Sequence, residues 1–85
     1  MRDVNAFATA NNVTLIAGSD PNVGIAGWLS AGGHGPITSM YGLGVDQVLA
    51  MEVVTADGVY RQIDASNEPD LFWALRGVCH IIICI

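Results

Sequence analysis

The amino-acid sequence predicts a small α+β fold. Helical patterns lie near both ends of the chain, at residues 3–12 and 66–77. Between them, two β-prone runs flank the dipeptide Asp57-Gly58, and residues 13–18 have the composition of a buried strand. The predicted order is helix, strand, glycine-rich loop, β-hairpin and helix, an arrangement typical of the α+β class.

The first helix is predicted to begin at Asp3, whose carboxylate can cap it, and to end at Asn11-Asn12. Its apolar face consists of Val4, Phe7, Ala8 and Ala10. The segment that follows, VTLIAG, is uncharged and apolar, and we expect it to form a buried strand.

Residues 20–44 are dense in glycine and are predicted to form loops and helix ends. The stretch VGIAGWLSA allows at most a short helix, because each glycine inside a helix costs about 1 kcal/mol relative to alanine. Consecutive glycines let backbone N–H groups converge on an anion, and a planar ring can lie against a chain that lacks Cβ atoms. Tight turns and close packing are the alternative purpose of these glycines, and their spacing alone leaves both open.

The run QVLAMEVVTADGVYRQID gives the clearest local prediction in the chain, a β-hairpin. Its two β-rich halves flank Asp57-Gly58, a dipeptide favoured in two-residue type I′ turns.

A second helix is expected after this hairpin. Ser66 or Asn67 can cap it. Pro69 and Asp70 suit its first turn, and Gly77 ends it. The side chains expected in the core are Leu71, Phe72, Trp73 and Leu75.

Other charged side chains give no specific catalytic signal. Arg76 is expected to interact favourably with the C-terminus of the second helix, with a phosphate contact as the alternative. The carboxylates of Asp46, Glu52 and Asp57 form no pair of predictable geometry, so a glycosidase is not indicated.

The composition excludes several classes of partner. The chain has 85 residues, a formal net charge of -5, eight acidic residues and three basic ones, all arginine. This charge repels a phosphate backbone, so nucleic-acid binding is not expected. No apolar run reaches the ~18 residues of a membrane span. The N-terminal residues lack the apolar core of a signal peptide, and no compartment is indicated.

The two cysteines, Cys79 and Cys84, lie close to the end of the chain and cannot make a disulfide framework. Together with His80 they supply three possible metal ligands, whereas structural zinc normally takes four. We therefore interpret residues 78–85 as an apolar tail and expect no metal.

Two phosphate-binding motifs do not fit the glycine-rich stretch. Its glycines lack the spacing of the dinucleotide fingerprint, and a P-loop needs a lysine, which the chain does not contain. The stretch GSDPNVGIAGWLSAGGHGPITSMYGLGVDQVLAMEVVTADG, followed by NEPDLFWALRG, closely resembles the FAD-linked oxidases of the berberine-bridge-enzyme type. These have the PCMH-type FAD-binding fold of the vanillyl-alcohol oxidase superfamily.

The resemblance runs from about Arg2 to Gly77 and implies a division of the chain. Residues 1–77 would form part of an FAD-binding domain, its second flavin subdomain, and residues 78–85 a divergent apolar tail. In the family, the DPNVG turn and the GGHG loop contribute to the wall around FAD. The cofactor contacts that this implies are at Asp20, Asn22, Gly24, Gly27, Gly32, Gly33, His34 and Gly35. A solvated loop position is the alternative for His34.

The sequence departs from the family pattern at four positions. Some relatives attach the flavin through a cysteine, and the matching position here is Asp20, which cannot form that thioether. Ala31 replaces the usual third glycine before the histidine. Gln47 replaces the asparagine that follows Asp46. Trp28 replaces a histidine or tyrosine, which changes a possible hydrogen-bond donor and adds bulk.

The resemblance implies a mechanism in which a hydride passes from a substrate carbon to flavin N5, assisted by a base, and oxygen then reoxidises the flavin to give hydrogen peroxide. The pyrophosphate-binding subdomain of the family is expected before Met1. Beyond Gly77, the resemblance implies a glycine-rich strand and then the substrate domain, which carries the base. Tyr41 and Tyr60 lie outside the family's catalytic segment, so the catalytic residues are unknown.

Two hypotheses follow. The first is a fragment of an FAD-dependent oxidoreductase that is not catalytic alone, with FAD as its partner and a small-molecule substrate only in a full-length parent. The second is a non-enzymatic truncated product that self-associates or binds other proteins through its apolar end.

Overall fold

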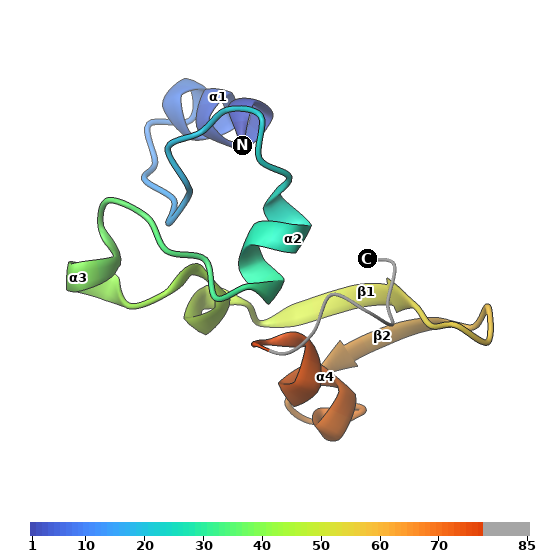
Figure 1. Cartoon of the computed structure of the whole chain (residues 1–85). Helices are drawn as coiled ribbons and strands as arrows, with labels where there is room; N and C mark the ends of the chain where they lie inside the picture. The colour runs from blue at the N-terminus through green and yellow to red at the C-terminus, as the bar shows by residue number, and fades with distance from the viewer. Residues whose placement is uncertain (78–85) are drawn as a thin grey trace.

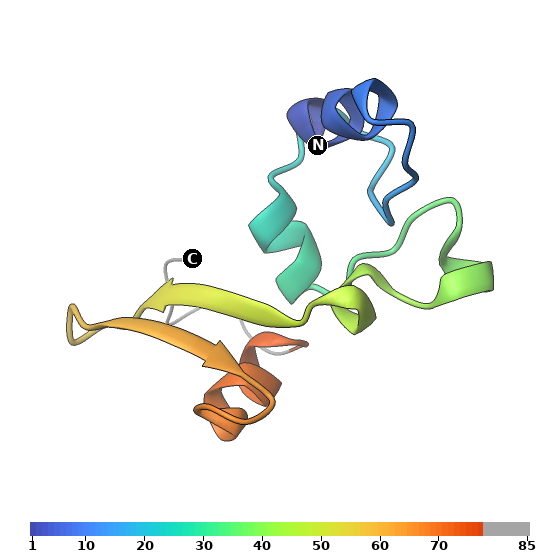
Figure 2. The ribbon, with the colours of Figure 1, turned by 180° about the vertical axis from the view of Figure 1, so that it is seen from behind.

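The computed structural model describes residues 1–77 and has the predicted α+β composition. Figure 1 shows α1, α2 and α3 on one side of the molecule, and the hairpin with α4 on the other. Figure 2 shows the same separation from behind. The elements are α1 (Arg2–Ala10), α2 (Ile25–Ser30), α3 (Thr38–Tyr41), the 3-10 helix η1 (Gly44–Gln47), β1 (Ala50–Val54), β2 (Tyr60–Asp64) and α4 (Pro69–Leu75).

Helix α1 ends where predicted but begins earlier. Asn11 is its C-cap, and Asn12 follows in the left-handed region with φ 51°. The N-cap is Met1, and no side chain caps the helix, so the prediction that Asp3 is the cap is wrong. Asp3 lies in the first turn instead, where its negative charge interacts favourably with the helix dipole.

The strand predicted over residues 13–18 is not formed. The main chain of residues 14–18 makes no hydrogen bond to any other described residue. A strand is defined by its ladder of hydrogen bonds to a neighbour, and β1 and β2 pair with each other elsewhere in the molecule. The sequence has strand character here, but the described part of the chain offers it no partner.

Helix α2 confirms the short helix predicted within VGIAGWLSA. It contacts η1, which lies just before the hairpin. Figure 1 shows α2 between α1 and the start of β1. The glycine-rich loop at residues 31–36 follows α2 directly and leads into α3.

The predicted hairpin is confirmed, but its turn is not type I′. Strands β1 and β2 are antiparallel, with Met51 opposite Ile63. Gly58 has φ 77°, whereas Asp57 is not among the residues with positive φ. The Thr55 N–H donates to the Val59 carbonyl, and the Gly58 N–H donates to the Thr55 carbonyl. This is a three-residue loop, in which only the glycine needs the left-handed conformation.

Helix α4 packs on β2 and completes the only core cluster in residues 1–77. The cluster consists of Val53, Ile63, Phe72 and Leu75, and partly buried Leu71 packs against it. Pro69 occupies the first turn as predicted. The prediction that Trp73 lies in the core is wrong, because its side chain is 73% exposed.

The predicted cap of α4 is also wrong. Its N-cap is Glu68, in the left-handed conformation. Ser66 and Asn67 lie before it and donate their N–H groups to the Asp64 carboxylate at 2.6 and 2.8 Å. They stabilise the bend between β2 and α4 and do not cap the helix.

Arg76 is the C-cap of α4. Its guanidinium lies 5.1 Å from the centre of the Phe72 ring, and its Nε donates to the Val45 carbonyl. This bond joins α4 to η1. Among residues 1–77, no helix combines the length and the apolar character needed to cross a membrane. The possible metal ligands Cys79, His80 and Cys84 lie outside the described residues.

Candidate cofactor-binding surface

The predicted cofactor residues lie on one segment, which runs from Asp20 through α2 to Gly35. The segment starts with a turn in which the Asp20 carboxylate accepts the Asn22 N–H at 2.8 Å. Both side chains are exposed. The amino group of Met1 donates to the Val23 carbonyl at 2.6 Å, which ties this turn to the start of α1. The turn is thus held by its own hydrogen bonds and leads directly into α2.

Gly24 and Gly27 present bare main chain to open space. Gly24 is the N-cap of α2, with φ -72° and ψ 132°, and Gly27 lies inside the helix. Both are exposed, and a Cβ added at either position would have no heavy atom within 4 Å. Neither glycine is required by the packing of the described chain.

Gly33 and Gly35 are in the opposite situation, because both are buried against their own chain. Gly33 has φ 76°, and a Cβ there would lie 3.0 Å from Gly44 Cα. A Cβ at Gly35 would collide with the main-chain carbonyl of Ala17. Gly32 has φ 104° and precedes them in the same turn. Close packing, the alternative purpose that the sequence left open, therefore accounts for Gly33 and Gly35.

Trp28 is the side chain around which this loop is packed. It projects from α2, and its indole Nε1–H donates to the His34 carbonyl at 3.0 Å. Added Cβ atoms at Gly18, Gly33 and Gly44 would lie 3.1 Å or less from the indole. The sequence showed Trp28 only as a departure from a family pattern. One sequence signal could have indicated this packing role: a large aromatic residue stands among the glycines of residues 18–44.

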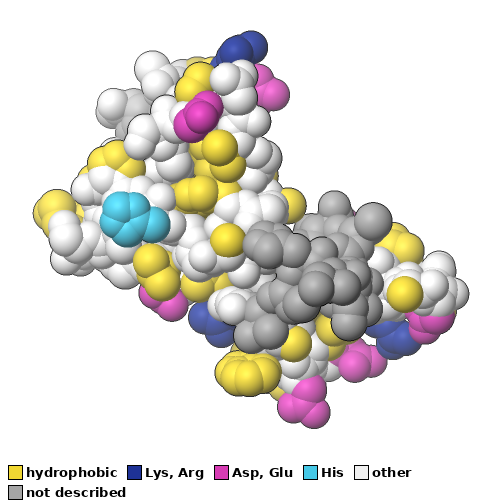
Figure 3. All heavy atoms as spheres, viewed as in Figure 1, with side chains coloured by type: hydrophobic (Ala, Val, Ile, Leu, Met, Phe, Trp, Pro, Cys, Tyr) yellow, Lys and Arg dark blue, Asp and Glu magenta, His cyan; other side chains and the backbone are white. Residues whose placement is uncertain are grey.

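His34 is exposed, and its side chain has no hydrogen-bond partner among residues 1–77. Figure 3 shows the histidine side chain at the surface of the part that contains α1 to α3. The cofactor contact expected at this exposed side chain stays a prediction. The main chain of His34 is nevertheless held, because its carbonyl accepts the Trp28 bond.

One hollow borders this segment, and another lies beside α3. One, of about 190 Å³, lies between α2 and β1, and its lining includes Ile25, Leu29, Met51 and Glu52. The other, of about 470 Å³, is lined by Thr14, Ile16, Ile37, Met40, Tyr41 and Gln47. Both are mostly apolar. A concave surface therefore exists beside α2, which is not buried as an interior helix.

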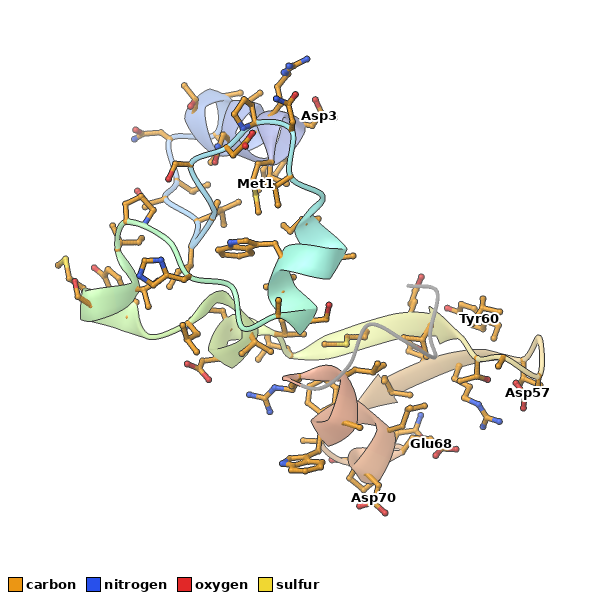
Figure 4. The ribbon with its side chains drawn as sticks, in the orientation of Figure 1. Met1, Asp3, Asp57, Tyr60, Glu68 and Asp70 are labelled. Carbon is orange, nitrogen blue, oxygen red and sulfur yellow. The ribbon has the colours of Figure 1, made fainter. Side chains whose placement is uncertain are left out.

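Within residues 1–77, the two titratable groups with a perturbed pKa lie elsewhere, on the hairpin. Desolvation, together with the hydrogen bond and negative charge of Glu52, raises the pKa of the Tyr60 phenol. Because its pKa is raised, less of this phenol is ionised at neutral pH, and it is less able to act as a base. Figure 4 shows Tyr60 and Asp57 on the hairpin, away from α2. The geometry therefore does not assign Tyr60 to the cofactor surface.

Comparison with known proteins identifies the family. The model of the FAD binding domain matches residues 1–64, well over half of the chain. The FAD-linked oxidoreductase phmC of Phaeosphaeria nodorum is 55% identical over 75 residues, which are 87% of this chain and 17% of that protein.

Solved structures agree. A VAO-type flavoprotein of Myceliophthora thermophila is 48% identical, with a TM-score of 0.84 over 89% of this chain and 14% of that one. The glucooligosaccharide oxidase of Acremonium strictum, which carries a 6-S-cysteinyl, 8α-N1-histidyl FAD, is 34% identical, with a TM-score of 0.81. This match covers 16% of the length of that oxidase and 89% of this chain.

The chain thus spans less than a fifth of the length of the relatives it matches. Its sequence and its fold agree with theirs over nearly all of that span. The resemblance seen in the glycine-rich stretch is confirmed, and an independent truncated product with a different role is not favoured. The chain belongs to the FAD binding domain family of the FAD-linked oxidoreductases, related in structure to the VAO-type flavoproteins, and its cofactor is FAD.

Proposed function

We propose that this chain supplies part of the wall around FAD in an oxidoreductase that oxidises a small-molecule substrate. Residues 1–77 would form the second flavin subdomain, and residues 78–85 would be a divergent tail. Within this wall, the cofactor would lie against the main chain of α2 and its entry turn. The exposed, unobstructed glycines Gly24 and Gly27 are the observation that carries the proposal.

The segment fits such a group in two ways. A flat ring system can approach main chain only where no Cβ stands in the way, and Gly24 and Gly27 meet that condition without being needed for internal packing. Gly33 is buried, yet its N–H donates to no acceptor within residues 1–77. Buried main-chain donors are almost always paired, so this N–H is available to a polar group of a ligand.

Charge restricts how the cofactor is held. The segment from Asp20 to Gly35 contains no lysine or arginine, so main-chain N–H groups would make the polar contacts of this wall. The remaining predicted contacts, at Asn22, Gly32, His34 and Gly35, are part of the proposal. Asp20 provides no sulfur, so we propose that this segment forms no cysteinyl linkage to the flavin.

Bound FAD supplies the hydride acceptor that oxidoreductases of this kind use. The residues of this chain would bind and orient the cofactor and exclude water from the side of the ring that they cover. We assign none of residues 1–77 as a catalytic base. The turnover of substrate is therefore a property proposed for the longer proteins that contain such a domain.

The test is to graft residues 1–77 into the Phaeosphaeria nodorum relative in place of its homologous segment. We expect the graft to retain FAD, measured as flavin absorbance per protein after gel filtration. Gly27→Ala should stabilise α2, because alanine is favoured over glycine in a helix by about 1 kcal/mol. It should also lower FAD retention, because the new methyl group projects toward the ring.

Gly77→Ala is the matched control, since a Cβ at Gly77 also has no heavy atom within 4 Å. This variant should retain as much FAD as the unmodified graft, with circular dichroism confirming that each protein is folded. Equal retention by the Gly27 and Gly77 variants would show that α2 does not face the cofactor. A folded graft without any flavin would contradict the proposal as a whole.

A further inference from the structure

The indole of Trp28 occupies a space that glycine residues leave open. A Cβ at Gly44 would lie 2.5 and 2.6 Å from Cζ3 and Cη2 of the indole, and one at Gly33 would lie 3.0 Å from Cζ3. A Cβ at Gly18 would lie 3.1 Å from Nε1. These three glycines are far apart in the sequence, and the indole is what they have in common.

The Cβ directions of Gly33 and Gly44 point at Trp28, so a cofactor cannot occupy the same space. Gly44 itself is buried, and its N–H donates to the Gly33 carbonyl at 2.8 Å. The Val45 N–H donates to the Gly32 carbonyl at 3.2 Å, next to it. The loop is thereby attached to η1 on one side and packed against the indole on the other.

The indole also makes a directed bond. Its Nε1–H donates to the His34 carbonyl, six residues further along the chain. Trp28 is half-buried in α2, so this bond fixes the position of the His34 main chain relative to that helix. A side chain that only filled space would not control the loop in this way.

We propose that Trp28 is the positioning residue of the glycine-rich loop. Its ring fills the space left by Gly18, Gly33 and Gly44, and its N–H holds the His34 carbonyl. The loop at residues 32–35 is thus shaped by a side chain of the chain itself, before any ligand binds. Trp28 holds the loop in this way whichever surface of α2 the FAD contacts.

A double-mutant cycle on the full 85-residue chain tests the space-filling part. Gly44→Ala should lower the folding equilibrium constant, measured by denaturant unfolding, by about tenfold or more, because overpacking a filled site is costly. Trp28→Leu removes the crowded ring atoms. In a chain that already carries it, Gly44→Ala should lower the folding equilibrium constant by less than about threefold.

Gly58→Ala is the matched control of the cycle. Its cost comes from the positive φ of 77° in the hairpin turn, where an added Cβ would meet no heavy atom within 4 Å and so does not touch Trp28. We expect its cost to be the same in both backgrounds. If Gly44→Ala costs as much in the Trp28→Leu background as it does in the wild type, the proposed packing of the indole is wrong.

The positioning part needs a different measurement, which also serves if the Trp28→Leu variant does not fold. In Trp73→Phe, Trp28 supplies the only indole N–H, and its hydrogen exchange should be slowed by the bond to His34. Trp28→Phe keeps an aromatic ring but has no donor. Amide exchange at residues 31–35 should then rise several-fold, while β1 and β2 stay unchanged. A rapidly exchanging indole, or an unchanged loop, would overturn the proposal.

Discussion

Gly27 and Gly33 lie six residues apart and meet different surroundings. Gly27 has open space where a Cβ would be, whereas Gly33 has a positive φ and contacts on two sides. The sequence shows that both are glycine, and it predicts a loop-rich region correctly. It cannot tell them apart, because the atoms that contact Gly33 come from Trp28 and Gly44, whose positions depend on the tertiary fold.

Alanine substitutions at these two positions should change the free energy of unfolding in opposite directions. Gly33→Ala should destabilise the chain by about 1–3 kcal/mol, through left-handed strain and overpacking. Gly27→Ala should stabilise it by up to about 1 kcal/mol through helix propensity. Denaturant unfolding of both variants measures the difference. Equal and unfavourable effects would mean that Gly27 is also packed against its own chain.

Ile63 is the most completely buried side chain of the hairpin, at 0% exposure. Ile63→Ala should cost about 2–5 kcal/mol of unfolding free energy, because it creates a cavity in the core cluster. Val54→Ala, on the neighbouring strand and 46% exposed, should change this free energy much less. Thermal unfolding followed by circular dichroism compares the two, and similar losses would place the core elsewhere.

At the level of elements, the hairpin and α4 were predictable because their signals are local. Two β-rich runs around a turn dipeptide, and a proline at the start of a helix, act within a few residues. The strand expected at residues 13–18 depends on a partner, and so did not follow from its composition. The cap predictions for Asp3, Ser66 and Asn67 were wrong because helix starts shift by a residue or two with the tertiary context.

The hairpin turn should be sensitive to acid through Asp57. Hydrogen bonds from the Thr55 hydroxyl and the Val59 N–H, with the charge of Arg61, lower the pKa of Asp57 below its ordinary value of 3.8. A lowered pKa in the folded state stabilises the fold above pH 3.8, and this contribution is lost as the pH falls through the lower value.

The prediction is checked by measuring the unfolding midpoint against pH for the wild type and Asp57→Asn. The difference between the two should be present near neutral pH and shrink below pH 3.8. Arg61 also forms an ion pair with Glu68 at 3.2 Å, which the variant leaves in place. A difference that stays constant down to strongly acidic pH would show that the charge of Asp57 does not stabilise the turn.

At the scale of the whole molecule, the core cluster belongs to the hairpin and α4, while α1 to α3 are held mainly by turns, glycine contacts and Trp28. The sequence predicted α1, α2, the hairpin and α4, but not this unequal division, because the division depends on which apolar faces meet. Phe7, Met40 and Tyr41 are each at least 60% exposed, although their residue types favour burial.

Hydrogen exchange should report this division directly. Amides of β1 and β2 that pair across the hairpin should exchange most slowly, since opening them requires disruption of the core cluster. Amides of residues 14–18, which have no acceptor among residues 1–77, should exchange rapidly. If the amides of both regions exchanged equally slowly, the chain would open as a single cooperative unit, and the predicted division would be wrong.

The two tryptophans stand in contrasting environments, one on each side of this division. Trp28 is half-buried and bonded within the glycine loop, whereas Trp73 is exposed on α4. Their fluorescence emission should therefore differ in wavelength. The two side chains should also differ in their access to a soluble quencher such as iodide. The protein thus carries a built-in optical reporter for each half, and single replacements with phenylalanine would let each be followed separately without any added label.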